Sequence, residues 1–250
     1  MHRRALVAAV LAAVAATAGC TAERTEAAPS SSAVARSTAV AAPSSSAVRA
    51  DPSLNGALLK AAASDDAAAV RDLLGRGAQI EARGADGRTP VVVATKNRAV
   101  AAAGALIDAG ADVNAKDDMQ DSAYLYAGAE GYDDILEMTL RHGADVRSVN
   151  RFGGTALIPA AEHGSVTTVR RLIEAGVDVD HVNTPGWTAL QEAVVYGDGS
   201  GRYQETVRAL LDAGADPDIR DANGRTVQDN ARRLGQNAIV EILQEDRPVR

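Results

Sequence analysis

Apolar residues recur along residues 54–245 at intervals of three and four positions, the spacing that places side chains on one face of an amphipathic helix. Residues 166–173 show this pattern clearly, with Val166, Val169, Leu172 and Ile173 on one helical face. Similar stripes are Val70, Leu73 and Leu74; Ile135, Leu136 and Leu140; and Val207, Leu210 and Leu211. Because two short helices cannot cover such a stripe, the pattern predicts that neighbouring units pack against it.

Two landmarks accompany this pattern at a common period. A glycine followed by a short alternating segment stands at positions 77, 110, 143, 176 and 214, and a hydroxyl residue opens the next apolar run at positions 89, 122, 155, 188 and 226. Both series have intervals of 33, 33, 33 and 38 residues. The agreement of two independent series predicts a repeat protein with a unit of 33 residues.

Each unit is predicted to contain two helices. In the unit that opens at Thr155, the hydroxyl can accept a hydrogen bond from an exposed amide of the first helical turn, and a short helix follows to Ala161. Gly164 separates this helix from a second one. Gly176 stands past the second helix, where a residue without Cβ adopts a positive φ at low cost. The order within a unit is therefore helix, turn, helix and glycine.

The opening of several units resembles a known signature. Thr89-Pro90 matches the start of the Thr-Pro-Leu-His signature of the ankyrin repeat family, and Thr155-Ala156-Leu157 and Thr188-Ala189-Leu190 match it in part. The resemblance covers residues 54–245. It implies an α-solenoid of ankyrin repeats in residues 53–250, built from helix pairs with short β-turn or β-hairpin fingers. About six units are expected, counting a first and a last unit with polar ends.

The units depart from the family pattern at three places. The signature histidine is absent, and its position holds Val92, Leu125, Ile158, Gln191 and Asp229. Thr188 and Gln191 nevertheless have the spacing of a capping box. Arg98 replaces the glycine between two helices, so either Asn97 takes the left-handed conformation or that unit, expected to be the least regular, bears about 1 kcal/mol of strain. Five extra residues, 198–202, lengthen the fifth unit as either a neutral insertion or a private contact.

Residues 1–20 are predicted to be an export signal. Arg3 and Arg4 give a charged start, which suits either the general secretory or the twin-arginine route, and an apolar run follows. Thr17-Ala18-Gly19-Cys20 resembles the lipobox of bacterial lipoproteins, which implies a lipidated Cys20 that anchors the chain at the outer face of the cell membrane. Cleavage after Ala18 would instead give a secreted or periplasmic soluble product. Residues 21–52, rich in Ala, Ser and Pro, are predicted to be a disordered tether.

Composition narrows the range of functions. A net charge of -7 argues against a nucleic-acid partner, and a single Cys allows no disulfide within the chain. His142, His163 and His181 lack the spacing of metal ligands. Paired carboxylates such as Asp117-Asp118 and Asp133-Asp134 are expected to be solvated or to stand at helix starts. We therefore expect no catalytic residue, no metal and no cofactor.

The ankyrin resemblance implies that a partner binds the concave side formed by the fingers and the first helices. The residues expected to contact it are Arg88, Met119, Asp121, Arg151, Phe152, His163, Trp187, Tyr196 and Arg225. The chain has one Phe and one Trp, both predicted to lie on fingers, and exposed aromatic and arginine side chains dominate binding energies. Either aromatic residue can instead pack between fingers, as is common in the family.

These observations favour a monomeric, non-catalytic module that binds another protein. Two alternatives stay open, namely an exported enzyme or solute-binding protein with a pocket in the solenoid, and a purely structural spacer. The enzyme or solute-binding protein requires a deep polar pocket or an acid–base pair. The spacer requires that changes in the fingers affect no partner.

Overall fold

The computed structural model describes residues 52–245 of the chain. The predicted export signal with Cys20, residues 21–51 of the predicted tether and residues 246–250 lie outside the described residues. The described part contains twelve α-helices and one 3-10 helix. They are α1 Pro52–Ala63, α2 Ala67–Gly75, η1 Ala85–Gly87, α3 Pro90–Lys96, α4 Val100–Asp108, α5 Ala123–Glu130, α6 Asp133–Arg141, α7 Leu157–Glu162, α8 Val166–Glu174, α9 Ala189–Val195, α10 Gly201–Asp212, α11 Val227–Arg233 and α12 Asn237–Glu245.

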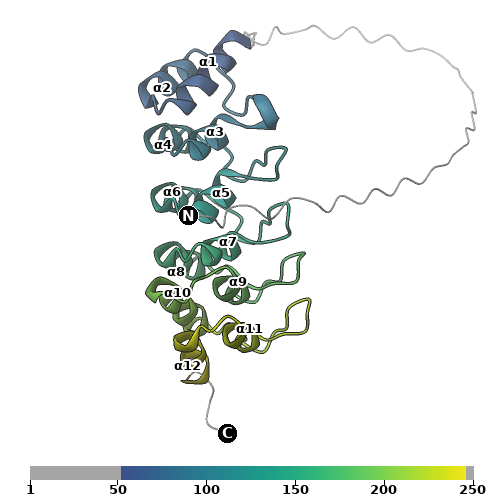
Figure 1. Ribbon diagram of the computed structural model, residues 1–250. Helices are drawn as coiled ribbons and strands as arrows, with labels where there is room; N and C mark the ends of the chain where they lie inside the picture. Colours follow the sequence, from purple (N-terminus) through teal and green to yellow (C-terminus); the bar gives the residue numbers. More distant parts are fainter. Residues whose placement is uncertain (1–51, 246–250) are drawn as a thin grey trace, which may run out of the picture. The chain divides into compact units, whose positions relative to one another are not determined.

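The helices form six consecutive pairs that stack on one another (Figure 1). Each odd-numbered helix from α1 to α9 packs against the next odd-numbered helix, and the even-numbered helices pack in the same way in a second layer. The odd-numbered layer lies between the even-numbered layer and a row of projecting loops (Figure 1). The predicted α-solenoid of helix pairs is confirmed.

Small residues at equivalent positions allow the pairs to stack closely. One buried alanine recurs on every odd-numbered helix, at Ala61, Ala94, Ala127, Ala160, Ala193 and Ala231. A buried leucine recurs on the even-numbered helices, at Leu73, Leu106, Leu172, Leu210 and Leu243, with Thr139 in its place on α6. Each unit therefore contributes equivalent buried aliphatic side chains to a continuous core. This explains how a chain with only 3% aromatic residues forms a hydrophobic core.

Four of the five predicted helix caps are confirmed. The hydroxyls of Thr89, Ser122, Thr188 and Thr226 each accept a hydrogen bond from the backbone N–H three residues later, at 3.5, 3.1, 3.2 and 3.2 Å. In α11 the bond is reciprocal, because the Asp229 carboxylate accepts from the N–H of Thr226. The capping box therefore occurs at Thr226 and Asp229 and not at Thr188 and Gln191.

The predicted cap at Thr155 is wrong. Helix α7 begins at Leu157, and Ala156 occupies the N-cap position without a side-chain bond. Pro159 has no N–H to donate to the carbonyl of Thr155, so this carbonyl accepts from Ile158 N–H instead, at 3.3 Å. That N–H is the one that a Thr155 cap would have used. The Thr155 hydroxyl is left buried, without a hydrogen-bond partner among the described residues.

The turn between paired helices requires a left-handed residue. Gly131, Gly164 and Gly235 supply it in three units, but in the second unit Arg98 adopts φ +53°. Asn97 stays at φ -93°, so the alternative in which Asn97 takes the left-handed conformation is wrong. The Arg98 guanidinium lies 5.3 Å from the centroid of the Tyr132 ring, a contact that offsets part of the backbone cost.

The 198–202 insertion is built into the stack. Helix α10 has twelve residues where α8 has nine, and the additional turn contains Tyr203. Tyr203 is buried, and its hydroxyl donates to the carbonyl of Glu162 in α7 at 3.0 Å. On the other side, the Gln236 amide donates to the carbonyls of Val194 and Gly197. The helical turn that the insertion adds therefore contacts the preceding unit through Tyr203, and the residues just before the insertion bond to Gln236 of the next unit.

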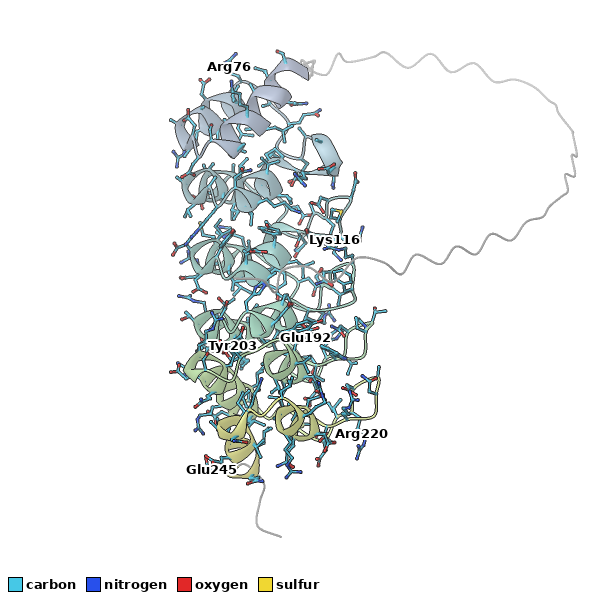
Figure 2. The ribbon with its side chains drawn as sticks, viewed as in Figure 1. Arg76, Lys116, Glu192, Tyr203, Arg220 and Glu245 are labelled. Carbon is cyan, nitrogen blue, oxygen red and sulfur yellow. The ribbon has the colours of Figure 1, made fainter. Side chains whose placement is uncertain are left out.

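Five projecting loops carry the tight turns predicted as fingers. We call residues 84–88, 117–121, 150–154, 183–187 and 221–225 the finger turns. In each, the backbone N–H of the first residue donates to the carbonyl of the fifth, at 2.9 to 3.0 Å. Residues 52–245 contain no β-strand, so the fingers are turns and not extended hairpins. Basic side chains join successive loops, since Arg83 donates to the carbonyl of Lys116, and Lys116 donates to that of Val149. Figure 2 labels Lys116.

Candidate functional site

The exposed large hydrophobic residues gather on one side of the stack. We call this side the finger face; it consists of the odd-numbered helices with their C-cap residues and of the finger loops, which join each even-numbered helix to the next odd-numbered one. Within residues 52–245, the large hydrophobic side chains left exposed are Met119, Phe152, Val182, Tyr196 and Leu234. Three belong to finger loops, and Tyr196 and Leu234 are the C-cap residues of α9 and α11. The even-numbered helices carry none of them, so the exposed large hydrophobic side chains of the described chain lie on the finger face.

A buried ion-pair network occupies the second and third units of this face. Lys96, the last residue of α3, places its Nζ 2.7 Å from Asp121 Oδ2 and 2.9 Å from Asp117 Oδ2. The same ammonium group lies 4.8 Å from the centroid of the Tyr126 ring. Arg88 approaches Asp117 at 3.6 Å. Lys96 is thus held by two carboxylates and an aromatic ring.

Asp117 is buried, so the expectation that it is solvated or at a helix start is wrong. Its side chain accepts hydrogen bonds from the backbone N–H groups of Met119 and Asp121, both at 2.9 Å. Burial alone would raise the pKa of Asp117, but these bonds and the Lys96 ammonium outweigh burial and lower the pKa. Asp133 and Asp134 stand in the first turn of α6, as expected.

Four of the predicted contact residues adjoin this network. Arg88 and Asp121 are members of it, and Arg151 lies 4.0 Å from Asp121. The Arg151 guanidinium also stacks 4.6 Å from the centroid of the Phe152 ring. Phe152 remains 51% exposed, whereas the carboxylate of Asp121 is engaged by Lys96. Phe152 and Arg151 are therefore available for a partner, and Asp121 is occupied within the molecule.

A second cluster lies on the unit of α9. The rings of Trp187 and Tyr196 are 5.3 Å apart between centroids and tilted by 46°. Tyr196 is 52% exposed, and Trp187 is half-buried against it. The backbone N–H of Trp187 donates to Asn183 Oδ1, and the Asn183 side-chain amide donates to Glu192 Oε1 at 2.8 Å. Figure 2 marks Glu192 among the odd-numbered helices.

Glu192 is a buried acid that the sequence did not single out. Glu192 is only 7% exposed to solvent. The pKa of Glu192 is raised to about 7, mainly by burial and also by the nearby carboxylate of Glu162, while the hydrogen bond from Asn183 opposes both effects. A comparison of equivalent positions could have indicated it, because the matching residues on α3, α5 and α7 are Val93, Tyr126 and Pro159, which carry no carboxylate.

The remaining predicted contact residues contribute no side chain to either cluster. Met119 is 43% exposed at the tip of its finger turn. His163 is exposed at the end of α7, with its Nδ1 2.8 Å from the carbonyl of Ala129. Arg225 is exposed, and its carbonyl accepts from the Gln191 amide at 3.1 Å. The structure therefore places all nine predicted residues on the finger face without joining them into one site.

Comparison with known proteins identifies the fold family. Residues 124–221 match the family model for ankyrin repeats in three copies, and residues 86–118 match the model for a single ankyrin repeat. The crystal structure of an ankyrin repeat domain from Acinetobacter baumannii is 53% identical, with a TM-score of 0.74 over 76% of this chain and 96% of that chain. The chain belongs to the ankyrin repeat family. The crystal structure of the ankyrin repeat protein EF0377 is 43% identical, with a TM-score of 0.74 over 76% of this chain and 98% of that one. A search of curated proteins gives no match.

Ankyrin repeats generally mediate protein–protein interaction and are generally non-catalytic. In this ankyrin protein, Gln191 occupies the position of the absent signature histidine. Its amide donates to the carbonyls of Ile219 and Arg225 in the next finger loop, at 3.2 and 3.1 Å. Asn230 Nδ2 then bridges Gln191 Oε1 and Asp221. Hydrogen bonding between a first helix and the next finger is thus present in this unit without the signature histidine.

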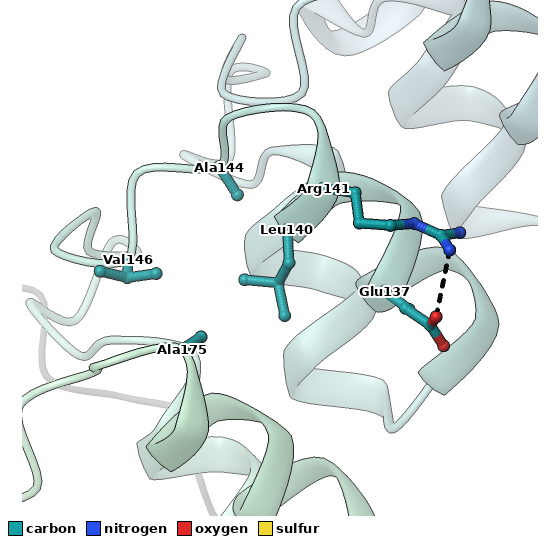
Figure 3. Close-up of a pocket in the computed structure, with 6 residues that line it drawn as sticks. All are labelled: Glu137, Leu140, Arg141, Ala144, Val146 and Ala175. Carbon is teal, nitrogen blue, oxygen red and sulfur yellow. Dashed lines mark ion pairs between the residues drawn. The ribbon is translucent and has the colours of Figure 1, made fainter.

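The ankyrin domain offers an open hollow beside α6 and the loop that follows it (Figure 3). It is lined by Glu137, Leu140, Arg141, Ala144, Val146 and Ala175. Its two ionisable residues, Glu137 and Arg141, pair with each other at 3.2 Å. In the described residues, no three His, Cys, Asp or Glu side chains gather as metal ligands. None of the helices within 52–245 has the length and apolar character of a membrane-spanning segment.

Proposed function

We propose that this ankyrin protein is a non-catalytic, monomeric protein-binding module whose partner docks on the finger face. The observation that supports this function is the confinement of exposed large hydrophobic side chains to that face. Exposed apolar residues that gather on one surface mark interaction sites, and aromatic and arginine residues contribute most of the binding energy. Phe152 under Arg151 and Tyr196 beside Trp187 supply two such aromatic groups.

The test is co-purification of partner proteins with the tagged full chain. The double variant Phe152→Ala, Tyr196→Ala removes two side chains that are more than half exposed, so its thermal stability should stay close to that of the unchanged chain. The control, Arg170→Ala with Glu174→Ala, alters two exposed residues of α8. Loss of the partner only in the finger-face variant supports the function. Equal recovery with both variants would favour the structural spacer.

We also propose that the chain is exported and anchored by a lipidated Cys20 at the outer face of the cell membrane. Support comes from the resemblance of Thr17-Ala18-Gly19-Cys20 to a lipobox and from the preceding apolar run. Incorporation of a labelled fatty acid tests the anchor in a bacterial host. The Cys20→Ser variant should lose the label and leave the membrane fraction. A soluble product cleaved at Ala18 from the unchanged chain would contradict the anchor and leave the binding function standing.

A further inference from the structure

The finger face of this protein contains its own example of how a cationic side chain is held. In the second and third units, the Lys96 ammonium lies between the carboxylates of Asp117 and Asp121 and over the Tyr126 ring. One carboxylate comes from the first residue of a finger turn, the second from its last residue, and the ring comes from the following odd-numbered helix. We call these four positions the cation site.

The same four positions recur 66 residues later with a different set of side chains. Asn183 stands at the position equivalent to Asp117, Trp187 at that of Asp121, and Glu192 at that of Tyr126. The aromatic ring and the carboxylate have exchanged places between finger and helix. Both finger residues keep their local role, because Asn183 Oδ1 accepts from Trp187 N–H as Asp117 accepts from Asp121 N–H.

The position that holds Lys96 in the first site holds a residue of opposite charge in the second site. The last residue of α3 is Lys96, and the last residue of α7 is Glu162. Glu162 acts on Glu192 as a like charge, and the Asn183 amide is the hydrogen-bond donor to Glu192. Among the described residues, the groups that shift the pKa of Glu192 include no basic side chain. The second site thus has the carboxylate and the aromatic surface of a cation site, and a second carboxylate where the first site has its ammonium group.

Three of the basic or ionisable groups on or beside the adjoining helices make contacts elsewhere. On α7, the ring of His163 bonds to the carbonyl of Ala129. On α11, Arg233 donates to Asn230 Oδ1. On α10, the Arg202 guanidinium stacks on the Tyr203 ring. The exposed ring of Tyr196 lies against Trp187 in the same cluster. Partial burial raises the pKa of the Tyr196 hydroxyl, and the carboxylates of Glu192 and Glu162 raise this pKa as well.

We propose that the finger face binds a lysine or arginine side chain of the partner protein between Glu162, Trp187, Glu192 and Tyr196. The proposal rests on the proposed function and names the chemistry of the partner. A cation placed there forms ion pairs with the carboxylates and stacks on aromatic rings, as Lys96 does with its own neighbours. It would also relieve the repulsion between Glu162 and Glu192. Charge complementarity thus selects a basic segment of a protein.

The test uses fluorescence of the full chain, because Trp187 is its one tryptophan. The probes are capped pentapeptides with a central lysine or arginine, and matched peptides with acetyl-lysine or norleucine. Only the first two should give a saturable change. Because the ionised Glu192 carries the interaction and its pKa is about 7, affinity for the lysine peptide should rise about tenfold between pH 6 and pH 8.

Two variants separate binding from folding. Glu192→Gln should weaken the lysine peptide at least about tenfold at pH 8 and abolish the pH dependence. Glu162→Gln, at the end of α7, should weaken it as well, and Glu174→Gln on α8 should leave it unchanged. Equal binding of lysine and acetyl-lysine peptides, no saturable change, or a pH-independent affinity would overturn the proposal.

The two proposals fail in different ways. If the finger-face variant Phe152→Ala, Tyr196→Ala loses its partner but the lysine peptide does not bind, the proposed binding of a basic side chain beside Glu192 is wrong and the binding function stands. If the peptide binds as expected but the finger-face variant keeps every partner, the site exists and the proposed function is wrong.

Discussion

Replacing Glu192 by glutamine should change how the stability of the domain depends on pH. Gln keeps an oxygen that can accept from Asn183 and removes the ionisable group. In the unfolded chain the carboxyl ionises near its ordinary pKa of 4.5, and in the folded chain its pKa is about 7. Below pH 4.5 both states are protonated, so the group has no effect. Between pH 4.5 and 7 the unfolded state ionises first, and stability falls as the pH rises. Above pH 7 the penalty is constant.

The magnitude follows from the size of the pKa shift. A shift from 4.5 to about 7 corresponds to about 3 kcal/mol, at 1.36 kcal/mol per unit of pKa. The stability difference between Glu192→Gln and the unchanged chain should therefore grow by about 2 to 3 kcal/mol from pH 4 to pH 8. Other titrating groups such as Asp117 are present in both proteins, so their contributions cancel.

Urea denaturation followed by circular dichroism at pH 4, 5, 6, 7 and 8 measures this difference. The control Glu174→Gln removes an exposed carboxylate of α8 and should show no trend with pH. A difference that stays constant, or that shrinks as the pH rises, would refute the conclusion that Glu192 is held by burial beside Glu162.

Three further substitutions test other parts of the structure. Lys96→Met should destabilise the domain by about 2 kcal/mol, since it leaves Asp117 buried without its ammonium partner; an unchanged urea midpoint would contradict this. Gln120→Gly should raise the stability by about 0.5 to 1 kcal/mol in thermal melts, because Gln120 has φ +62°, whereas Gln120→Ala keeps the backbone cost and should give no gain. Tyr203→Ala should cost about 3 kcal/mol of unfolding free energy by emptying the contact between the inserted turn and α7; a neutral result would show that the insertion is dispensable.

The repeat architecture could be predicted because it depends on periodic residues. The buried alanines and leucines recur at the same interval as the glycines and hydroxyl residues, so the sequence pattern and the packing pattern coincide. The failure at Thr155 has a local cause. Pro159, four residues later, removes one backbone donor and alters the first turn, an effect that the threonine alone does not reveal.

The candidate site could be predicted only in part. Exposure of Phe152 and Tyr196 follows from their place in the unit, which the period fixes. The ion pairs of Lys96 and the burial of Glu192 depend on contacts between side chains of adjacent units. Such contacts change from one unit to the next, because the residues at equivalent positions differ in charge. Periodicity therefore locates the finger face, but the chemistry of each part of that face requires coordinates.

The most direct measurement of the binding face is photo-crosslinking from three single positions in the full chain. A photoreactive amino acid at position 152 or 196 lies on the finger face, and one at position 174 lies on the even-numbered layer. If the finger face is the binding surface, the first two positions should capture the same partner and position 174 should not. Capture with equal yield from position 174, or capture from that position alone, would contradict it.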